Sequence, residues 1–319
     1  MKKIIFMGTP QFAAEVLTGL LNSPYEIIAV VTQPDRPVGR KRILTESPVK
    51  QLAKSHQIPV YQPEKLSGSP EMETLMKLGA DLIVTAAYGQ FLPTKLIEST
   101  PYTAINVHAS LLPKYRGGAP IHYAIWRGER ETGVSIMYMT RQMDAGDVLA
   151  QRSCMIEQTD DVGLLFEKLA TIGRELLLDT LVRLFNHEIT AVKQDESQVI
   201  FSPQITKEQE QIHWEQSASQ VDCHVRAFRP FPTTYTWLDG NRVKIWAGAP
   251  FDYQGENAPV GTIVAVKRQQ LIVQCGQQTY YAIQEWQESG KKRMTIEEYL
   301  KGNAISDIVG KQLLMQEEG

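Results

Sequence analysis

Short apolar runs alternate with amphipathic segments over the first 138 residues, and this alternation limits the chain to few folds. The strand candidates are residues 4–7, 27–32, 82–87, 104–107 and 134–139, and helical segments lie between them at 12–21, 48–54 and 121–126. Strands joined through helices pair in parallel with right-handed crossovers. We therefore predict an α/β fold with an open, doubly wound (Rossmann-like), mostly parallel sheet.

The rest of the chain predicts a second, all-β domain behind a linker. A strand at 147–155 and a long amphipathic helix at 161–185 close the first domain. Residues 187–211 are polar and without periodicity, which indicates a linker. A helix at 217–228 precedes five short strand candidates, at 234–238, 243–247, 262–266, 271–274 and 280–283, typical of a small β-barrel of the oligonucleotide-binding type. The predicted domains are 1–189 and 209–319, with a linker at 190–208.

Bulk properties exclude several classes of protein. No apolar run approaches the ~20 residues of a membrane span, and Gly8 cuts short the basic, then apolar, start, which favours a buried strand over a signal peptide. Cys154, Cys223 and Cys275 are far apart, which argues against a disulfide framework or a zinc site and fits a cytoplasmic protein. The six histidines show no ligand spacing, so we expect no metal. A net charge of −3 leaves any nucleic-acid binding to local basic patches.

The turn after the first strand argues against a nicotinamide-dependent dehydrogenase. Gly8-Thr9-Pro10 stands where a dinucleotide-binding fold has Gly-x-Gly-x-x-Gly. Only the first glycine is present, and Pro10 lacks the backbone N–H that would have to approach a pyrophosphate. We interpret the segment as a tight strand-to-helix turn.

Asn106 and His108 stand at the end of a predicted central strand. Side chains at i and i+2 point to the same face of a strand, and open α/β sheets bind ligands at the carboxyl ends of their strands. Asp144 follows the next predicted strand, whose carboxyl end we expect to face the same crevice. An amide donor, an imidazole and a carboxylate together indicate chemistry on a carbonyl carbon. The alternatives are a structural histidine and a loop-capping aspartate, a role that Asp147 fits better.

Two other segments at strand ends, residues 86–93 and 110–113, combine backbone polar groups with apolar side chains. This mixture favours a flat ligand with polar edges, with plain strand-to-loop packing as the alternative. The connection at 33–47 is longer than the 2–6 residues usual between a strand and a helix. Its cationic side chains are Arg36, Arg40, Lys41 and Arg42. They indicate binding to a phosphate backbone, with a solvated loop as the alternative. Residues 267–268 and 291–293 are weaker basic signals.

Taken together, these motifs resemble the 10-formyltetrahydrofolate-dependent formyltransferases. The signature is Asn106-x-His108 followed by Ser-Leu-Leu-Pro-x-x-Arg-Gly, with Asp144-x-Gly-Asp in a later loop. The resemblance extends along nearly the whole chain, through residues 6–13, 32–37, 47–50, 87–93 and 226–232.

The resemblance implies transfer of a formyl group from 10-formyltetrahydrofolate, as a cosubstrate, to the α-amine of methionine esterified to initiator tRNA. Asn106 and His108 would stabilise the oxyanion, and Asp144 would organise proton movement. The implied folate-binding residues are Ser110, Leu111, Leu112, Pro113, Tyr88, Gln90, Phe91 and Leu92, with 140–144 also near the pterin. The implied tRNA contacts are Arg36, Arg40, Lys41 and Arg42. We expect a monomer that acts in the cytoplasm.

Four alternatives stay open at this point. An enzyme that formylates glycinamide ribonucleotide should end near residue 200, whereas this chain continues. A sugar formyltransferase and a formyl-folate hydrolase share the chemistry but do not need the basic loop. A non-catalytic RNA-binding protein on the same scaffold would not need Asn106, His108 and Asp144.

Overall fold

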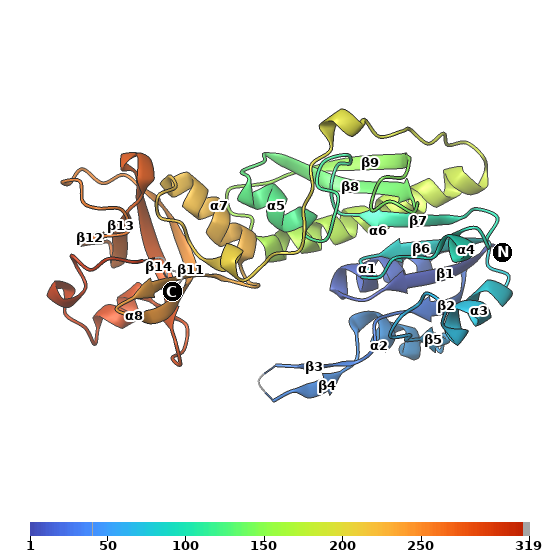
Figure 1. Ribbon diagram of the computed structural model, residues 1–319, viewed down its shortest axis with the longest axis horizontal. Coiled ribbons are helices and arrows are strands. Elements are labelled where there is room, and N and C mark those ends of the chain that lie inside the picture. Colours follow the sequence, from blue (N-terminus) through green and yellow to red (C-terminus); the bar gives the residue numbers. More distant parts are fainter. Residues whose placement is uncertain (40, 315–319) are drawn as a thin grey trace. The chain divides into compact units, whose positions relative to one another are not determined.

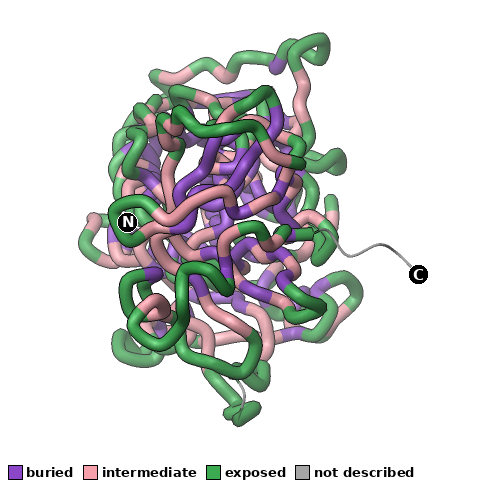
Figure 2. Tube along the Cα trace, turned by 90° about the vertical axis from the view of Figure 1, so that its left-hand side faces the viewer, coloured by how far each residue is buried: buried purple, intermediate pink, exposed green. Residues whose placement is uncertain are grey.

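The computed structural model describes residues 1–39 and 41–314, which form two compact units (Figure 1). Unit 1 consists of Met1–Pro120, Glu131–Met155 and Phe166–Pro203. Unit 2 consists of Ile121–Arg130, Ile156–Leu165 and the chain from Gln204 onward. Buried residues gather in the interior, and exposed residues lie mainly on the outer loops (Figure 2). Two segments that precede residue 189, Ile121–Arg130 and Ile156–Leu165, therefore belong to unit 2. The domain boundaries at 189 and 209 stay a prediction.

Unit 1 contains a seven-stranded sheet with the order β5-β2-β1-β6-β7-β8-β9. The strands are β1 (Lys3–Gly8), β2 (Glu26–Val31), β5 (Val60–Tyr61), β6 (Leu82–Ala86), β7 (Ala104–His108), β8 (Glu131–Tyr138) and β9 (Val148–Met155). The first five pair in parallel, as predicted. Because β1 lies between β2 and β6, the strand order reverses there, and ligands of doubly wound sheets bind at such a point.

We predicted that the strand at 134–139 would pair in parallel like the four before it, and this is wrong. It is part of β8, which runs antiparallel to β7, with His108 opposite Ser135. The next strand, β9, runs antiparallel to β8. The helix between β7 and β8, α5 (Pro120–Trp126), belongs mostly to unit 2, where Trp126 stacks on His224. Because α5 does not cross back over the sheet, the chain enters β8 beside the carboxyl end of β7.

Helices cover both faces of this sheet (Figure 1). They are α1 (Gln11–Leu21), α2 (Pro48–Ser55), α3 (Pro70–Lys77), α4 (Thr94–Ile97) and α6 (Val162–Phe185). On one face, Ile5 and Met7 of β1 share a core with Leu75 of α3 and Leu96 of α4. On the other face α1 and α6 are neighbours, and a Cβ at Gly173 would lie 3.0 Å from a methyl group of Val107. The doubly wound arrangement is thus confirmed.

Local sequence signals account for two element ends in unit 1. The Ser47 hydroxyl caps α2 by accepting from the Lys50 N–H at 3.1 Å, with Pro48 at the first helical position. At the end of β1, a Cβ at Gly8 would lie 2.6 Å from the Cβ of Ala13 and 2.8 Å from the Ala86 carbonyl oxygen. Only glycine permits this approach, which confirms the tight strand-to-helix turn.

Unit 2 contains an antiparallel sheet with the order β10-β11-β14-β13-β12. Its strands are β10 (Thr234–Leu238), β11 (Asn241–Phe251), β12 (Ile263–Lys267), β13 (Gln270–Gln274), β14 (Tyr280–Glu288) and β15 (Met294–Thr295), the last paired with β14. The helices are α7 (Ala218–Phe228) and α8 (Ile296–Leu300). All five predicted strands are present.

The two edges of this sheet are linked by the chain near its carboxyl end, a feature absent from the sequence-based prediction. Trp237 of β10 exchanges both backbone hydrogen bonds with Leu314, at 3.1 and 2.9 Å. The N–H groups of Gly310 and Leu313 donate to the carbonyls of Ile263 and Gly261 at the other edge. Residues 310–314 therefore supply the pairing that brings the open sheet toward a barrel.

The remaining elements are short. A hairpin of β3 (Arg36–Val38) and β4 (Ile43–Thr45) leaves unit 1 between β2 and α2. Single 3₁₀ turns are η1 (Glu196–Gln198), η2 (Glu208–Glu210), η3 (Gly276–Gln278) and η4 (Ile305–Asp307). Across residues 1–39 and 41–314, no helix is both long and apolar enough to cross a membrane.

Candidate active site

The candidate site lies at the carboxyl end of β7, beside the ends of β1 and β6. Asn106 is half-buried and forms a pair with Thr85 across the β6–β7 ladder. The Thr85 hydroxyl, itself buried, lies 2.8 Å from Oδ1 of Asn106 and donates to it. Because the amide oxygen accepts this bond, the amide nitrogen of Asn106 keeps its two N–H donors for another partner.

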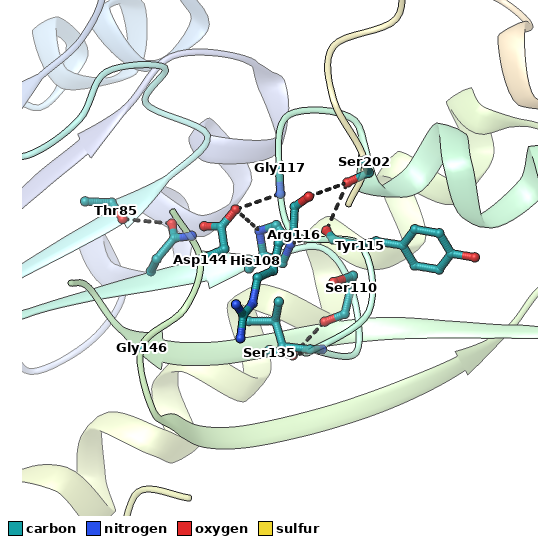
Figure 3. Close-up of polar contacts among 12 residues, drawn as sticks. Thr85, His108, Ser110, Tyr115, Arg116, Gly117, Ser135, Asp144, Gly146 and Ser202 are labelled. Carbon is teal, nitrogen blue, oxygen red and sulfur yellow. Dashed lines mark hydrogen bonds and ion pairs between the residues drawn. The ribbon is translucent and has the colours of Figure 1, made fainter. Parts of the chain in front are cut away.

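His108 is buried, and its two ring nitrogens have different neighbours (Figure 3). Nε2 lies 2.9 Å from the carbonyl oxygen of Tyr115. A carbonyl can only accept, so Nε2 carries the proton in this contact. Nδ1 faces the carboxylate of Asp144, 3.8 Å from Oδ2. In the neutral ring Nδ1 is therefore the free base, and on protonation it becomes a donor beside a negative charge.

Asp144 comes close to His108 because its loop folds back over the sheet (Figure 3). We expected the carboxyl end of β8 to face the crevice. This is wrong, because β8 is antiparallel to β7 and its last residue, Tyr138, lies opposite Ile105 rather than His108. The loop then returns, and Asp144 adopts a positive φ of 50°. Its Oδ2 accepts from the backbone N–H of Gly117 at 2.9 Å. Asp144 thus reaches His108, whose strand also carries Asn106, by a different route from the one we expected.

The segment after β7 is held from below by Ser135 of β8 (Figure 3). The Ser135 hydroxyl donates to the Ser110 carbonyl at 2.6 Å and accepts from the Leu112 N–H at 3.0 Å. Gln151 of β9 donates to the same hydroxyl at 2.8 Å and to the Leu112 carbonyl at 2.9 Å. The hydroxyl of Ser110 is fully buried and donates to the Lys114 carbonyl at 2.6 Å. Ser110 is therefore bonded within its own loop.

Few of the predicted folate-binding side chains have free polar groups. Gln90 accepts from the Leu66 N–H at 2.8 Å and donates to carbonyls at 63 and 64, so its amide fixes a neighbouring loop. Tyr88 and Leu92 are buried in the core beside α3 and α4, and burial raises the pKa of Tyr88 to about 12. The accessible apolar members are Phe91, 69% exposed, and two half-buried residues of the loop after β7, Leu111 and Pro113; Leu112 is buried.

The predicted basic loop is the β3–β4 hairpin. Pro37 pairs with Leu44, and Val38, Ile43 and Leu44 are all exposed. Arg36 forms an ion pair with Glu64 at 2.6 Å, and Arg40 lies outside the described residues. Lys41 and Arg42 are exposed at the tip, where Arg42 has a φ of 47°. The hairpin therefore presents cations and aliphatic side chains together.

The segment that we interpreted as a linker contributes buried groups to this region. Ser202 is fully buried, and its N–H donates to the Arg116 carbonyl at 2.7 Å. Arg116 is 4% exposed and donates from Nε and Nη2 to Gln194, at 3.0 and 2.9 Å. Gln194 in turn donates to the carbonyls of Asp144 and Gly146. No periodicity or motif in the sequence marks Gln194 or Ser202, because their partners are mostly backbone carbonyls.

Within the described part of the chain, no three His, Cys, Asp or Glu side chains form a group that could hold a metal ion.

Two family models match successive parts of the chain. The family model for formyl transferase matches residues 1–181, and the model for the formyl transferase C-terminal domain matches residues 204–304. The chain is 53% identical over 313 residues to the methionyl-tRNA formyltransferase of Levilactobacillus brevis, over 98% of this chain and 99% of that one. It is 52% identical over 302 residues to the protein of the same name from Enterococcus faecalis, over 95% and 96% of the two chains.

A solved structure shows the same fold at much lower identity. It is an N-formyltransferase from Helicobacter canadensis, described as a complex with folinic acid and dTDP-3-aminofucose. The TM-score is 0.67 at 17% identity, over 90% of this chain and 100% of that one.

Proposed function

The chain belongs to the formyl transferase family, and from this premise we propose that it transfers the formyl group of 10-formyltetrahydrofolate to the methionyl α-amine of initiator methionyl-tRNA. The proposed catalytic residues are Asn106, His108 and Asp144. The observation that carries the proposal is the arrangement at the end of β7, where the Asp144 carboxylate lies 3.8 Å from Nδ1 of His108. Because the acceptor is a tRNA, we place the reaction in the cytoplasm, in the initiation of translation.

Asn106 stabilises the negative charge that forms when the amine attacks. Attack makes a carbon–nitrogen bond at the formyl carbon and moves the carbonyl electron pair onto its oxygen. The free N–H donors of Asn106 bind that oxygen, while Thr85 holds the other end of the amide. One preorganised donor of this kind lowers the barrier by about 3–4 kcal/mol.

His108 and Asp144 move the proton that the attacking nitrogen must lose. The free Nδ1 of His108 accepts it, and the resulting imidazolium is stabilised by the carboxylate 3.8 Å away. The protonated Nδ1 then donates this proton to the folate nitrogen as its bond to the formyl carbon breaks. The oxyanion electron pair re-forms the carbonyl, so charge and protons balance. General acid–base catalysis of this type typically contributes about 10²–10⁴-fold.

The accessible surfaces suggest where the two substrates bind. Leu111, Pro113 and Phe91 offer apolar contacts beside the backbone of the 88–92 and 110–113 segments, which suits the flat pterin of the donor. Lys41 and Arg42 on the hairpin suit the phosphates of the tRNA acceptor end. Of the other predicted contacts, Arg36 lies on β3 of the same hairpin, and Arg40 lies outside the described residues.

An assay with defined acceptors tests the proposal. The purified protein is incubated with 10-formyltetrahydrofolate and methionyl initiator tRNA, methionyl elongator tRNA or a dTDP-linked amino sugar, and products are resolved on acid gels or by mass spectrometry. We expect rapid formylation of the initiator tRNA alone. Formylation of the sugar instead, or release of tetrahydrofolate without an acylated product, would contradict the proposed acceptor.

A further inference from the structure

Gln194 joins the two loops that meet at the candidate site. It lies 50 residues after Asp144, in the polar segment following α6, and is 6% exposed. Its Nε2 donates to the carbonyl of Asp144 at 2.8 Å and to the carbonyl of Gly146 at 2.7 Å. Its Oε1 accepts from Arg116 of the loop after β7, at 3.0 and 2.9 Å.

Each polar atom of this side chain is fully used. A glutamine amide has two N–H donors and an oxygen with two lone pairs, and here both N–H groups and both lone pairs have partners. The guanidinium of Arg116, 4% exposed, is paired beyond Gln194 with Glu196 at 2.8 Å. A glutamate at 194 would keep the acceptor for Arg116 but would place an oxygen against two carbonyls. The contact to the Asp144 loop therefore requires the amide nitrogen.

The bonds of Gln194 fix the backbone on both sides of the contact that orients the carboxylate. Asp144 has a φ of 50°, in the left-handed region, which is uncommon for residues other than glycine, although aspartate adopts it more often than most. Its Oδ2 accepts from the N–H of Gly117, the residue after Arg116. Gln194 thus holds the backbone of Asp144 directly. Through the side chain of Arg116, it also holds the loop in which the N–H of Gly117 binds the Asp144 carboxylate.

We propose that Gln194 is a positioning residue of the reaction, which sets the distance between the Asp144 carboxylate and His108. This inference rests on the proposed catalytic role of Asp144. The alternative is that Gln194 only stabilises the fold, in which case its loss would lower the melting temperature without moving the carboxylate.

The test compares Gln194→Met, which has similar length and no hydrogen bonds, with Gln194→Glu, which keeps only the acceptor. Gln198→Met is the matched control, because Gln198 is exposed in the same segment and bonds to Asp195. For each full-length variant, kcat and KM for the folate donor and the initiator tRNA are measured below its melting temperature. In parallel, the amide proton of Gly117 is followed by NMR without substrates, since its chemical shift reports the bond to Asp144.

We expect both Gln194 variants to lose about 10- to 100-fold in kcat, because a displacement of about 1 Å can cost 10²-fold. Both KM values should change little, the Gly117 amide signal should move upfield, and Gln198→Met should match the wild type. If the Met variant does not fold, Gln194→Glu carries the same test. An unchanged Gly117 signal, or an unchanged kcat, in a folded Gln194 variant would overturn the proposal. If the Gly117 signal moves in the Gln194 variants but the wild-type protein formylates no tRNA, the proposed function is refuted. The positioning of the Asp144 carboxylate by Gln194 would then still hold.

Discussion

At the scale of single residues, the site divides its tasks by what each atom can donate or accept. Asn106 offers its two N–H groups to a ligand, because the bond from Thr85 to its oxygen sets the orientation of the amide. His108 offers only Nδ1, because Nε2 is bound to the Tyr115 carbonyl. The donor for the oxyanion and the base for the amine are therefore separate groups on one strand.

Removing either group should affect turnover more than binding. We expect Asn106→Ala or His108→Ala to lower kcat at least ~10²-fold, with little change in the dissociation constant for initiator tRNA. Single-turnover formylation and filter binding measure the two quantities. Near-wild-type turnover in either variant would contradict the assignment.

Thr85 offers a finer test of the same geometry. Thr85→Val keeps the shape of the side chain but removes the bond to Oδ1 of Asn106, so the amide is free to rotate and its N–H groups are no longer directed. We expect kcat to fall about 10-fold, on the order of 1.4 kcal/mol, whereas Thr85→Ser, which keeps the hydroxyl, should recover most of the activity. Equal activity of the Val and Ser variants would show that this bond is not needed.

At the scale of elements, the β3–β4 hairpin exposes side chains that packing within unit 1 does not explain. Val38, Ile43 and Leu44 are exposed although aliphatic, and the basic residues at the tip are exposed too. The sequence predicted the charge of this segment but not its hairpin form, because its two strands are only three residues each.

Neutralising the hairpin should weaken use of the tRNA. We expect the double variant Lys41→Ala, Arg42→Ala to raise KM for initiator tRNA about 10-fold or more and to reduce its dependence on salt, since fewer phosphate contacts release fewer counterions. KM for the folate donor should not change. Lys95→Ala, an exposed lysine of α4, is the control for general charge. An increased KM for folate in the double variant would contradict the role assigned to the hairpin.

At the scale of the whole molecule, unit 2 is assembled from three separate stretches of chain. Within it, His224 of α7 is 1% exposed, stacks on Trp126 of α5 and lies 2.8 Å from the Gln209 carbonyl. Burial lowers the pKa of His224 to about 4, with the bond to Gln209 acting in the opposite direction. The folded protein thus holds this ring neutral.

This burial predicts a pH dependence of stability. Because the folded pKa lies below the usual 6.5, the unfolded chain binds the proton more tightly, and stability present above pH 6.5 is lost as the pH falls toward 4. Between pH 7 and pH 5 we expect His224 to account for about 2 kcal/mol of lost stability. Urea unfolding of wild type and His224→Gln, which keeps an N–H donor but does not titrate, measures it. Parallel losses in both proteins would show that His224 is not responsible.

The sequence by itself determined much of the secondary structure and the identity of the catalytic candidates. The alternating apolar runs specified β1, β2, β6, β7 and β8, Ser47 and Pro48 specified the start of α2, and the spacing of Asn106 and His108 put them at one strand end. These signals are local: a side chain repeats with the period of its own element, and a cap bonds within one turn.

Only the tertiary structure decided the direction of β8, the return of Asp144 to His108, the pairing of residues 310–314 with both edges of the second sheet, and the place of Gln194. Each of these depends on hydrogen bonds to backbone carbonyls or on strand pairing far along the chain. Every residue carries a carbonyl, so such a partner leaves no pattern in the sequence, and it is specified only when the whole chain has folded.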